Sequence, residues 1–211
     1  MRAVLRNLRP AFAILLASFI LPGAHAGGNV LKQEVSAGTI ELHVGVPGLA
    51  YIGQPLQDFR TKFPKAEVAP FSGQEDAMSV KAGDAGISCI AVGGPGDLKL
   101  ASVGFNLEGS YEGLAEGDYR TRQGIGKGST VNDLLGAYGK PVDILGERPR
   151  GALRRPRPGG DASARQKYLY ANADGSVRTY FLVENSRVTR VVVNDLGPLD
   201  QHIVKASPKK K

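Results

Sequence analysis

Two segments of this chain carry the same short helical motif, and this repeat constrains the fold more than any other feature. The run G-Q-P-L-Q-D-F-R-T-K-F-P-K at 53–65 aligns without a gap with G-S-T-V-N-D-L-L-G-A-Y-G-K at 128–140. Counted from Leu56 and from Val131, the apolar positions at the first, fourth and eighth places fall on one face of a helix. A repeat of about 75 residues is too long for a solenoid unit, so it indicates a small domain that was duplicated. The matching apolar pairs are Leu56 with Val131, Phe59 with Leu134, and Phe63 with Tyr138.

Alternating apolar and polar residues, separated by Gly-rich turns, predict strands on both sides of each helix. The expected fold class is α+β: two tandem repeats, each a strand and a short helix packed on a four-stranded antiparallel meander. Residues 27–107 form the first repeat, 108–117 an acidic, Gly-containing linker, and 118–197 the second repeat. Thr130 and Asp133 have the spacing of a capping box at the second helix. The expected strands are 38–46, 66–71, 77–82, 86–92 and 98–106, then 118–124, 142–146, 166–171, 176–184 and 187–194.

Residues 1–26 have the pattern of a secretory signal peptide. Basic residues precede an apolar run at 11–21, and Ala24-His25-Ala26 supplies the small residues of a cleavage site. The run is shorter than a membrane span, so we do not expect a membrane-spanning chain. Cleavage near Ala26 predicts a mature protein in the periplasm or outside the cell. The alternative interpretation of this segment is a short N-terminal anchor.

The positive charge of the chain is concentrated in one loop and in the tail at 198–211. Residues 148–167 contain seven basic residues and one acidic residue, interrupted by Pro and Gly. This composition fits a solvated insertion, or an electrostatic contact with an acidic protein, a lipid headgroup or an anionic polymer. Aromatic side chains for base stacking are absent from 148–167, so we do not expect nucleic acid as a partner. The candidate contacts are Arg148, Arg150, Arg154, Arg155 and Arg157.

The motifs of catalysis and cofactor binding are not met. In Gly124–Thr130, Gly128 separates Lys127 from the hydroxyl residues, so the run does not match a phosphate-binding P-loop. After residue 26 the only histidines are His43 and His202, which have no metal-ligand spacing. We therefore expect that the chain binds neither a metal nor a cofactor, and that it is not an enzyme.

Cys89 is the only cysteine, which excludes an intramolecular disulfide. It alternates with Ile87 and Ala91, so the pattern predicts a buried, inert thiol. A reactive or dimer-forming thiol is the alternative.

The run G-S-T-V-N-D-L-L-G-A-Y-G-K-P at 128–141, followed by a meander, resembles the helix-plus-sheet module of two envelope families. These are the β-lactamase inhibitor protein family, which carries the module in tandem, and the small outer-membrane assembly lipoproteins, which carry it once. In the inhibitor family an acidic residue in a first-domain hairpin turn enters the target enzyme. The resemblance implies that role for Asp84, in the turn 82–86. An ordinary turn acid is the other interpretation of Asp84.

These observations favour a secreted or periplasmic, non-catalytic protein-binding module. One form of this function is inhibitor-like binding of an enzyme. The alternative is a cell-envelope assembly or surface-tethering factor that uses the basic loop. A helix covering one face of each sheet leaves the opposite face available for a partner protein. Arg178 and Arg190, on the expected strands 176–184 and 187–194, are the candidate contacts on that face.

Overall fold

The computed structural model describes residues 37–71, 74–109, 111–146 and 165–199. The expected signal peptide at 1–26 lies outside the described residues, as do residues 200–211 of the expected basic tail at 198–211. So does most of the basic loop, from residue 147 to residue 164.

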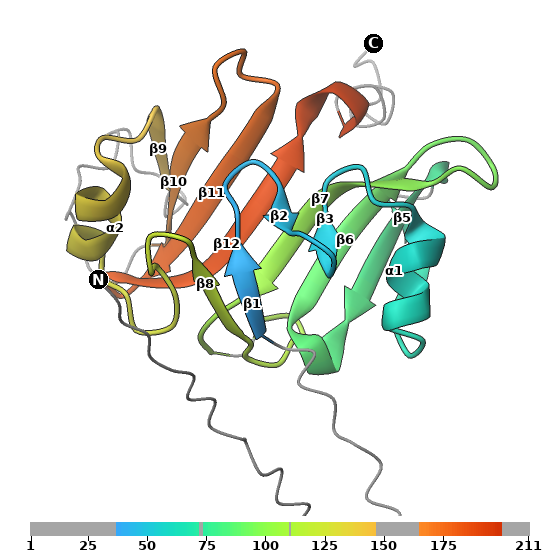
Figure 1. Ribbon diagram of the computed structural model, residues 1–211, viewed down its shortest axis with the longest axis horizontal. Coiled ribbons are helices and arrows are strands. Elements are labelled where there is room, and N and C mark those ends of the chain that lie inside the picture. The colour runs from blue at the N-terminus through green and yellow to red at the C-terminus, as the bar shows by residue number, and fades with distance from the viewer. Residues whose placement is uncertain (1–36, 72–73, 110, 147–164, 200–211) are drawn as a thin grey trace, which may run out of the picture. The chain divides into compact units, whose positions relative to one another are not determined.

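The fold is α+β and is built on an eight-stranded antiparallel sheet (Figure 1). The strand order is β4-β5-β6-β7-β12-β11-β10-β9, so each set of four strands in sequence forms a meander. The strand positions agree with the alternation of the sequence to within a few residues. The bounds are β4 Glu67–Phe71, β5 Gln74–Ala82, β6 Ile87–Val92, β7 Lys99–Asn106, β9 Asp143–Gly146, β10 Gln166–Ala171, β11 Val177–Glu184 and β12 Arg187–Asp195.

The two meanders share one sheet, which differs from the two separate four-stranded sheets expected from the sequence. β7 pairs with β12 in antiparallel register, with Val103 opposite Val193 and Phe105 opposite Val191. All four side chains are fully buried. The physical reason is that β7 and β12 would otherwise both be edge strands with unpaired backbone groups. Their pairing satisfies those groups and extends one core through both halves of the chain.

Four short strands lie outside the main sheet. β1 (Ala37–Ile40) pairs in parallel with β8 (Asp118–Thr121), and β2 (Gly45–Val46) forms a hairpin with β3 (Ala50–Tyr51). The continuous strand expected at 38–46 is therefore wrong, because the chain turns at His43, where φ is 63°.

Both helices form where the repeated motif predicts them. α1 spans Leu56–Lys62 and α2 spans Val131–Tyr138. The expected apolar stripes face the core: Phe59 and Leu134 have no exposed surface. α2 contacts the second meander through Tyr138, whose ring centroid lies 5.5 Å from that of Phe181 on β11. The helices therefore cover one face of the sheet.

Each helix begins beside the last strand of its own meander. The backbone N–H of Leu56 donates to the carbonyl oxygen of Leu98 at 2.8 Å, just before β7. The N–H of Val131 donates to the carbonyl oxygen of Ser186 at 3.1 Å, just before β12. The two motifs thus occupy equivalent places relative to their strands.

The capping box expected at α2 is present and leads to a first prediction. The Thr130 hydroxyl accepts from the Asp133 N–H at 3.2 Å, and the Asp133 carboxylate accepts from the Thr130 N–H at 2.8 Å. We expect Thr130→Ala to lower the free energy of unfolding by about 1 kcal/mol, measured by urea denaturation. Ser129→Ala is the control, because its hydroxyl accepts from the Gly126 N–H in the preceding turn and does not cap the helix. Equal losses in both variants would contradict the prediction.

The hydrogen bonds from the Thr130 backbone and side chain also lower the pKa of Asp133. A carboxylate with a lowered pKa stabilises the fold above its unfolded pKa, and this contribution is lost as the pH falls through the folded pKa. The difference between wild type and Thr130→Ala should therefore shrink in acid.

Candidate binding surface

The face of the main sheet opposite the helices carries apolar and basic side chains at its β9–β11 side. Residues two apart on a strand, and residues opposite each other in the register, share one face. Tyr180 lies opposite Leu169 and Val192, and Leu182 lies opposite Lys167. Leu145 on β9 is 44% exposed, and the other members of the group are half-buried or partly exposed. We call this group the open-face patch: Leu145, Lys167, Arg178, Tyr180, Leu182 and Val192.

The rest of this face is partly covered by the chain itself. Leu199 packs on Ala77, Val92 and Ala101 in a small cluster of buried residues. At the other end, the stretch 108–117, expected from the sequence to be a linker, folds back so that Tyr111 covers Arg190 on β12. Asn106 holds this stretch by donating from Nδ2 to the carbonyl oxygens of Gly109, at 2.8 Å, and Ala115, at 2.9 Å. Among the described residues, the open-face patch thus lies apart from the places that Leu199 and the stretch 108–117 cover.

Arg178 lies where the sequence places it. It is half-buried on β11, opposite Asn194 on β12 and Ala171 on β10. Asn194 is itself held by the Ser102 hydroxyl, which donates to Asn194 Oδ1 at 2.7 Å. Arg178 therefore borders the apolar part of the patch and remains a candidate contact.

Arg190 is on the predicted face, but its expected exposure is wrong: only 6% of the residue is exposed. Its guanidinium donates to the Ser88 hydroxyl, and the Tyr111 ring covers it with the ring centroid 4.0 Å from Arg190 Cζ. Burial lowers the pKa of Arg190, and the nearby Tyr111 and Glu112 side chains oppose that change. The correction has a physical cause, because the stretch 108–117 closes over this side chain. Tyr111 is the only aromatic residue in that stretch, and this was the available sequence signal.

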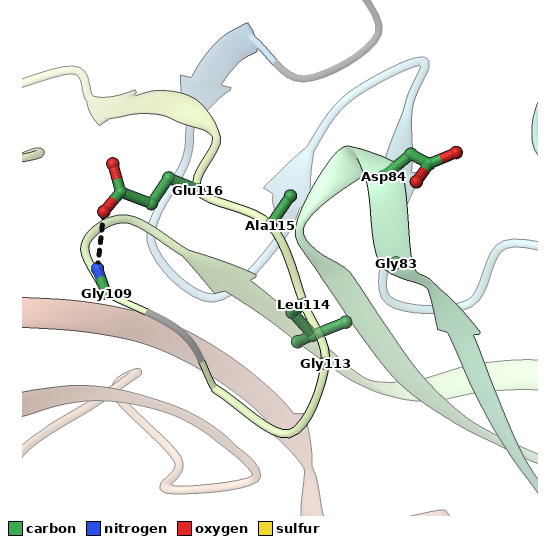
Figure 2. Close-up of a pocket in the computed structure, with 7 residues that line it drawn as sticks. All are labelled: Gly83, Asp84, Gly109, Gly113, Leu114, Ala115 and Glu116. Carbon is green, nitrogen blue, oxygen red and sulfur yellow. Dashed lines mark hydrogen bonds between the residues drawn. The ribbon is translucent and has the colours of Figure 1, made fainter.

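Asp84 lies in a short 3₁₀ turn, Gly83–Ala85, between β5 and β6. It is exposed, and it borders a shallow hollow of about 410 Å³ (Figure 2). Its carboxylate points away from the facing segment 113–116, whose Ala115 N–H donates to the Gly83 carbonyl oxygen at 2.8 Å. The turn that carries Asp84 is therefore anchored to the segment that covers Arg190. The hollow is lined by Gly83, Asp84, Gly109, Gly113, Leu114, Ala115 and Glu116.

The basic loop candidates Arg148, Arg150, Arg154, Arg155 and Arg157 lie outside the described residues. The end of the predicted loop belongs to the sheet, because β10 begins at Gln166. Arg165 pairs with Glu184, with 2.9 Å between Nε and Oε1.

The residues considered for catalysis have structural contacts. Lys127, in the glycine-rich run before α2, is bound to the Glu116 carboxylate. His43 Nδ1 lies 3.2 Å from the Thr179 hydroxyl oxygen, and burial lowers the pKa of His43. Cys89 is buried, as predicted, and burial raises the pKa of its thiol. Within the described ranges, His, Cys, Asp and Glu residues do not gather in threes that could hold a metal ion.

No helix among the described residues has the length and the apolar composition that a membrane span requires.

Comparison with known proteins gives little further information. No family model matches the chain, and no curated protein matches it. One solved structure with some likeness is that of a DUF4309 family protein, YjgB, from Bacillus subtilis. It is 14% identical in sequence, with 72% of this chain and 88% of that chain covered and a TM-score of 0.42. A TM-score this low does not establish a common fold.

Proposed function

We propose that this chain is an exported, non-catalytic protein-binding module, and that the open-face patch contacts its partner. The observation that carries the proposal is the patch itself. Tyr180, Leu182 and Val192 are adjacent, half-buried apolar side chains on rigid strands, and Arg178 and Lys167 flank them. Tyrosine and arginine beside apolar surface are enriched among the residues that dominate protein interfaces. Inhibitor-like binding of an enzyme is one form of this function.

The export part of the proposal is supported by the sequence pattern of residues 1–26, with cleavage near Ala26 into the periplasm or the medium.

We also infer that the two halves arose by duplication. Support comes from the gapless motif alignment and from the equivalent hydrogen bonds that join each helix start to the strand of its own meander. In both halves the helix is followed by four antiparallel strands. Helices packed on one face of an antiparallel sheet close the core on that side and leave the other face available for binding.

The second candidate function is envelope assembly or surface tethering through the basic loop. It is favoured by one observation: five arginines lie within residues 148–157, between the edge strand β9 and its neighbour β10. Such a charge cluster attracts acidic proteins, lipid headgroups or anionic polymers, and exposed charges are screened over about 8 Å at physiological ionic strength. Binding through the loop should therefore weaken strongly with salt.

Two variants, one altered in the open-face patch and one altered in the basic loop, distinguish the two functions by whether they still bind a partner. We expect Arg178→Glu with Tyr180→Ser to weaken partner binding at least about 30-fold, because interface hot spots contribute about 2 kcal/mol or more. The triple change of Arg154, Arg155 and Arg157 to Ser should leave it intact. The measurement is affinity capture from envelope extract with the mature protein, followed by titration of the captured partner.

Arg60→Glu is the matched control, because it makes the same charge change at an exposed position of α1, on the covered side of the sheet. If only the triple variant fails to bind the partner, and the same variant is no longer retained on anionic vesicles, the result would favour tethering over the first function. Wild-type binding in both variants would reject both surfaces.

A further inference from the structure

Two neighbouring residues of the sheet hold buried polar atoms without hydrogen-bond partners. In the part of the chain that the structure describes, these atoms are Asn106 Oδ1 and Arg190 Nε and Nη1. Asn106 and Arg190 lie directly opposite each other in the β7–β12 register, so both side chains are on the face away from the helices. The unsatisfied acceptor and the unsatisfied donors therefore belong to one place in the fold.

The arginine is held flat against the sheet. Gly104 on β7 lies under it, and a Cβ at that position would be 2.6 Å from Arg190 Nη2 and 3.0 Å from Nε. Ser88 accepts from Nη2 on one side, and the Tyr111 ring covers the group. The position of the guanidinium is thus fixed while Nε and Nη1 keep their N–H groups free.

The orientation of the Asn106 amide is also fixed by its contacts. Its Nδ2 faces three carbonyl oxygens, of Gly109 at 2.8 Å, Ala115 at 2.9 Å and Leu114 at 3.4 Å. Exchanging oxygen and nitrogen would point an acceptor at three acceptors, so Oδ1 is the atom without a partner. The site consequently needs a donor for Asn106 and an acceptor for Arg190.

A buried charge without enough partners destabilises a fold, and replacing it with an apolar side chain is often neutral or stabilising. Unsatisfied buried groups call for an explanation, and a ligand that supplies the missing partners is one. The Nε–H and Nη1–H groups of Arg190 point to different sides of the guanidinium, so one carboxylate accepts from one of them and not from both. A carboxylate with an adjacent N–H would supply a partner to each residue, because one oxygen accepts from Nε or Nη1 of Arg190 while the N–H donates to Asn106 Oδ1.

We propose that Arg190 and Asn106 form a binding site for a carboxylate adjacent to an N–H group. The free C-terminus of a peptide and an N-acylated amino acid both have this chemistry. Binding requires the Tyr111 ring to leave the guanidinium. Asn106 donates to the carbonyl oxygens of Gly109 and Ala115, on either side of Tyr111 in the sequence. The site does not depend on the function proposed for the open-face patch.

The test is a titration of the full mature protein with N-acetylglycine, followed by calorimetry and by NMR of the Tyr111 ring and Arg190 Nε–H signals. We expect saturable binding that shifts both signals, and at least a tenfold loss of affinity in Arg190→Gln. N-acetylglycinamide, which lacks the carboxylate, and acetate, which lacks the N–H, should bind at least tenfold more weakly. A tripeptide with a free C-terminus, compared with its C-terminal amide, shows whether a peptide end is accepted as well.

The controls keep the proposal falsifiable. Arg60→Gln, at an exposed arginine of α1 outside both proposed sites, should leave N-acetylglycine binding unchanged. If Arg190→Gln does not fold, Tyr111→Ala provides the test, because it uncovers Arg190 and should bind N-acetylglycine at least as tightly as the wild type.

Absence of binding in wild type and Tyr111→Ala would overturn the proposal and indicate bound water as the missing partner. Equal affinity for acetate and N-acetylglycine would also overturn it. Arg178→Glu with Tyr180→Ser leaves this site intact, so the patch and the carboxylate site can fail separately.

Discussion

Replacing Phe105 with alanine is expected to lower the free energy of unfolding by about 3–5 kcal/mol, because a large buried aromatic leaves a cavity that the fold cannot fill. Phe105 has no exposed surface and lies on β7, where its ring centroid is 5.0 Å from that of Tyr119. It also pairs with Val191 of β12, at the joint between the two meanders. The measurement is chemical denaturation followed by circular dichroism.

The same experiment tests whether the two halves unfold together. Because one core includes residues of both meanders, we expect a single transition that moves to lower denaturant as a whole. Leu145→Ala is the control, since Leu145 is 44% exposed and should lose less than about 0.5 kcal/mol. Two separate transitions, with only the first affected by Phe105→Ala, would show that the halves are independent domains.

Gly86→Ala is expected to lower the free energy of unfolding by about 2–4 kcal/mol, from left-handed backbone strain together with a steric clash. Gly86 has a φ of 67°, and a Cβ there would lie 2.5 Å from the carbonyl oxygen of Ala115. That oxygen belongs to backbone held by Asn106, so it cannot move aside at low cost. Thermal and urea unfolding of the variant measure the loss.

Gly175→Ala is the matched control for that clash. Its φ is 73°, but nothing lies within 4 Å of the added Cβ, so only the backbone strain of about 1–2 kcal/mol applies. Equal losses in the two variants would show that the contact between the β5–β6 turn and the covering segment is not tight.

The sequence predicted well what depends on neighbouring residues. Alternation located β6 and β11, where buried and half-buried residues alternate along most of each strand. The Thr130–Asp133 spacing predicted a cap that forms between residues three apart. The burial of Cys89 follows from the same local pattern. In each case the signal and the structure lie within the same few residues.

The features that the sequence could not predict depend on segments far apart in the chain. The β7–β12 pairing joins two strands whose separate patterns fit edge strands as well as central ones. Arg190 alternates as a solvent-facing residue, and only the return of the segment around Tyr111 buries it. The turn at His43 interrupts a run that alternates through it without a break. Local patterns do not contain these contacts.

The position of β12 also sets the order in which the fold can be completed. β12 is the last strand of the described residues, yet it lies in the middle of the sheet and pairs with β7 on one side and β11 on the other. During synthesis the first meander must therefore wait with β7 as an unpaired edge until the final strand emerges. Contacts of such high sequence separation slow folding. In that interval the edge of β7 exposes unpaired backbone groups, to which a strand of a second molecule can add.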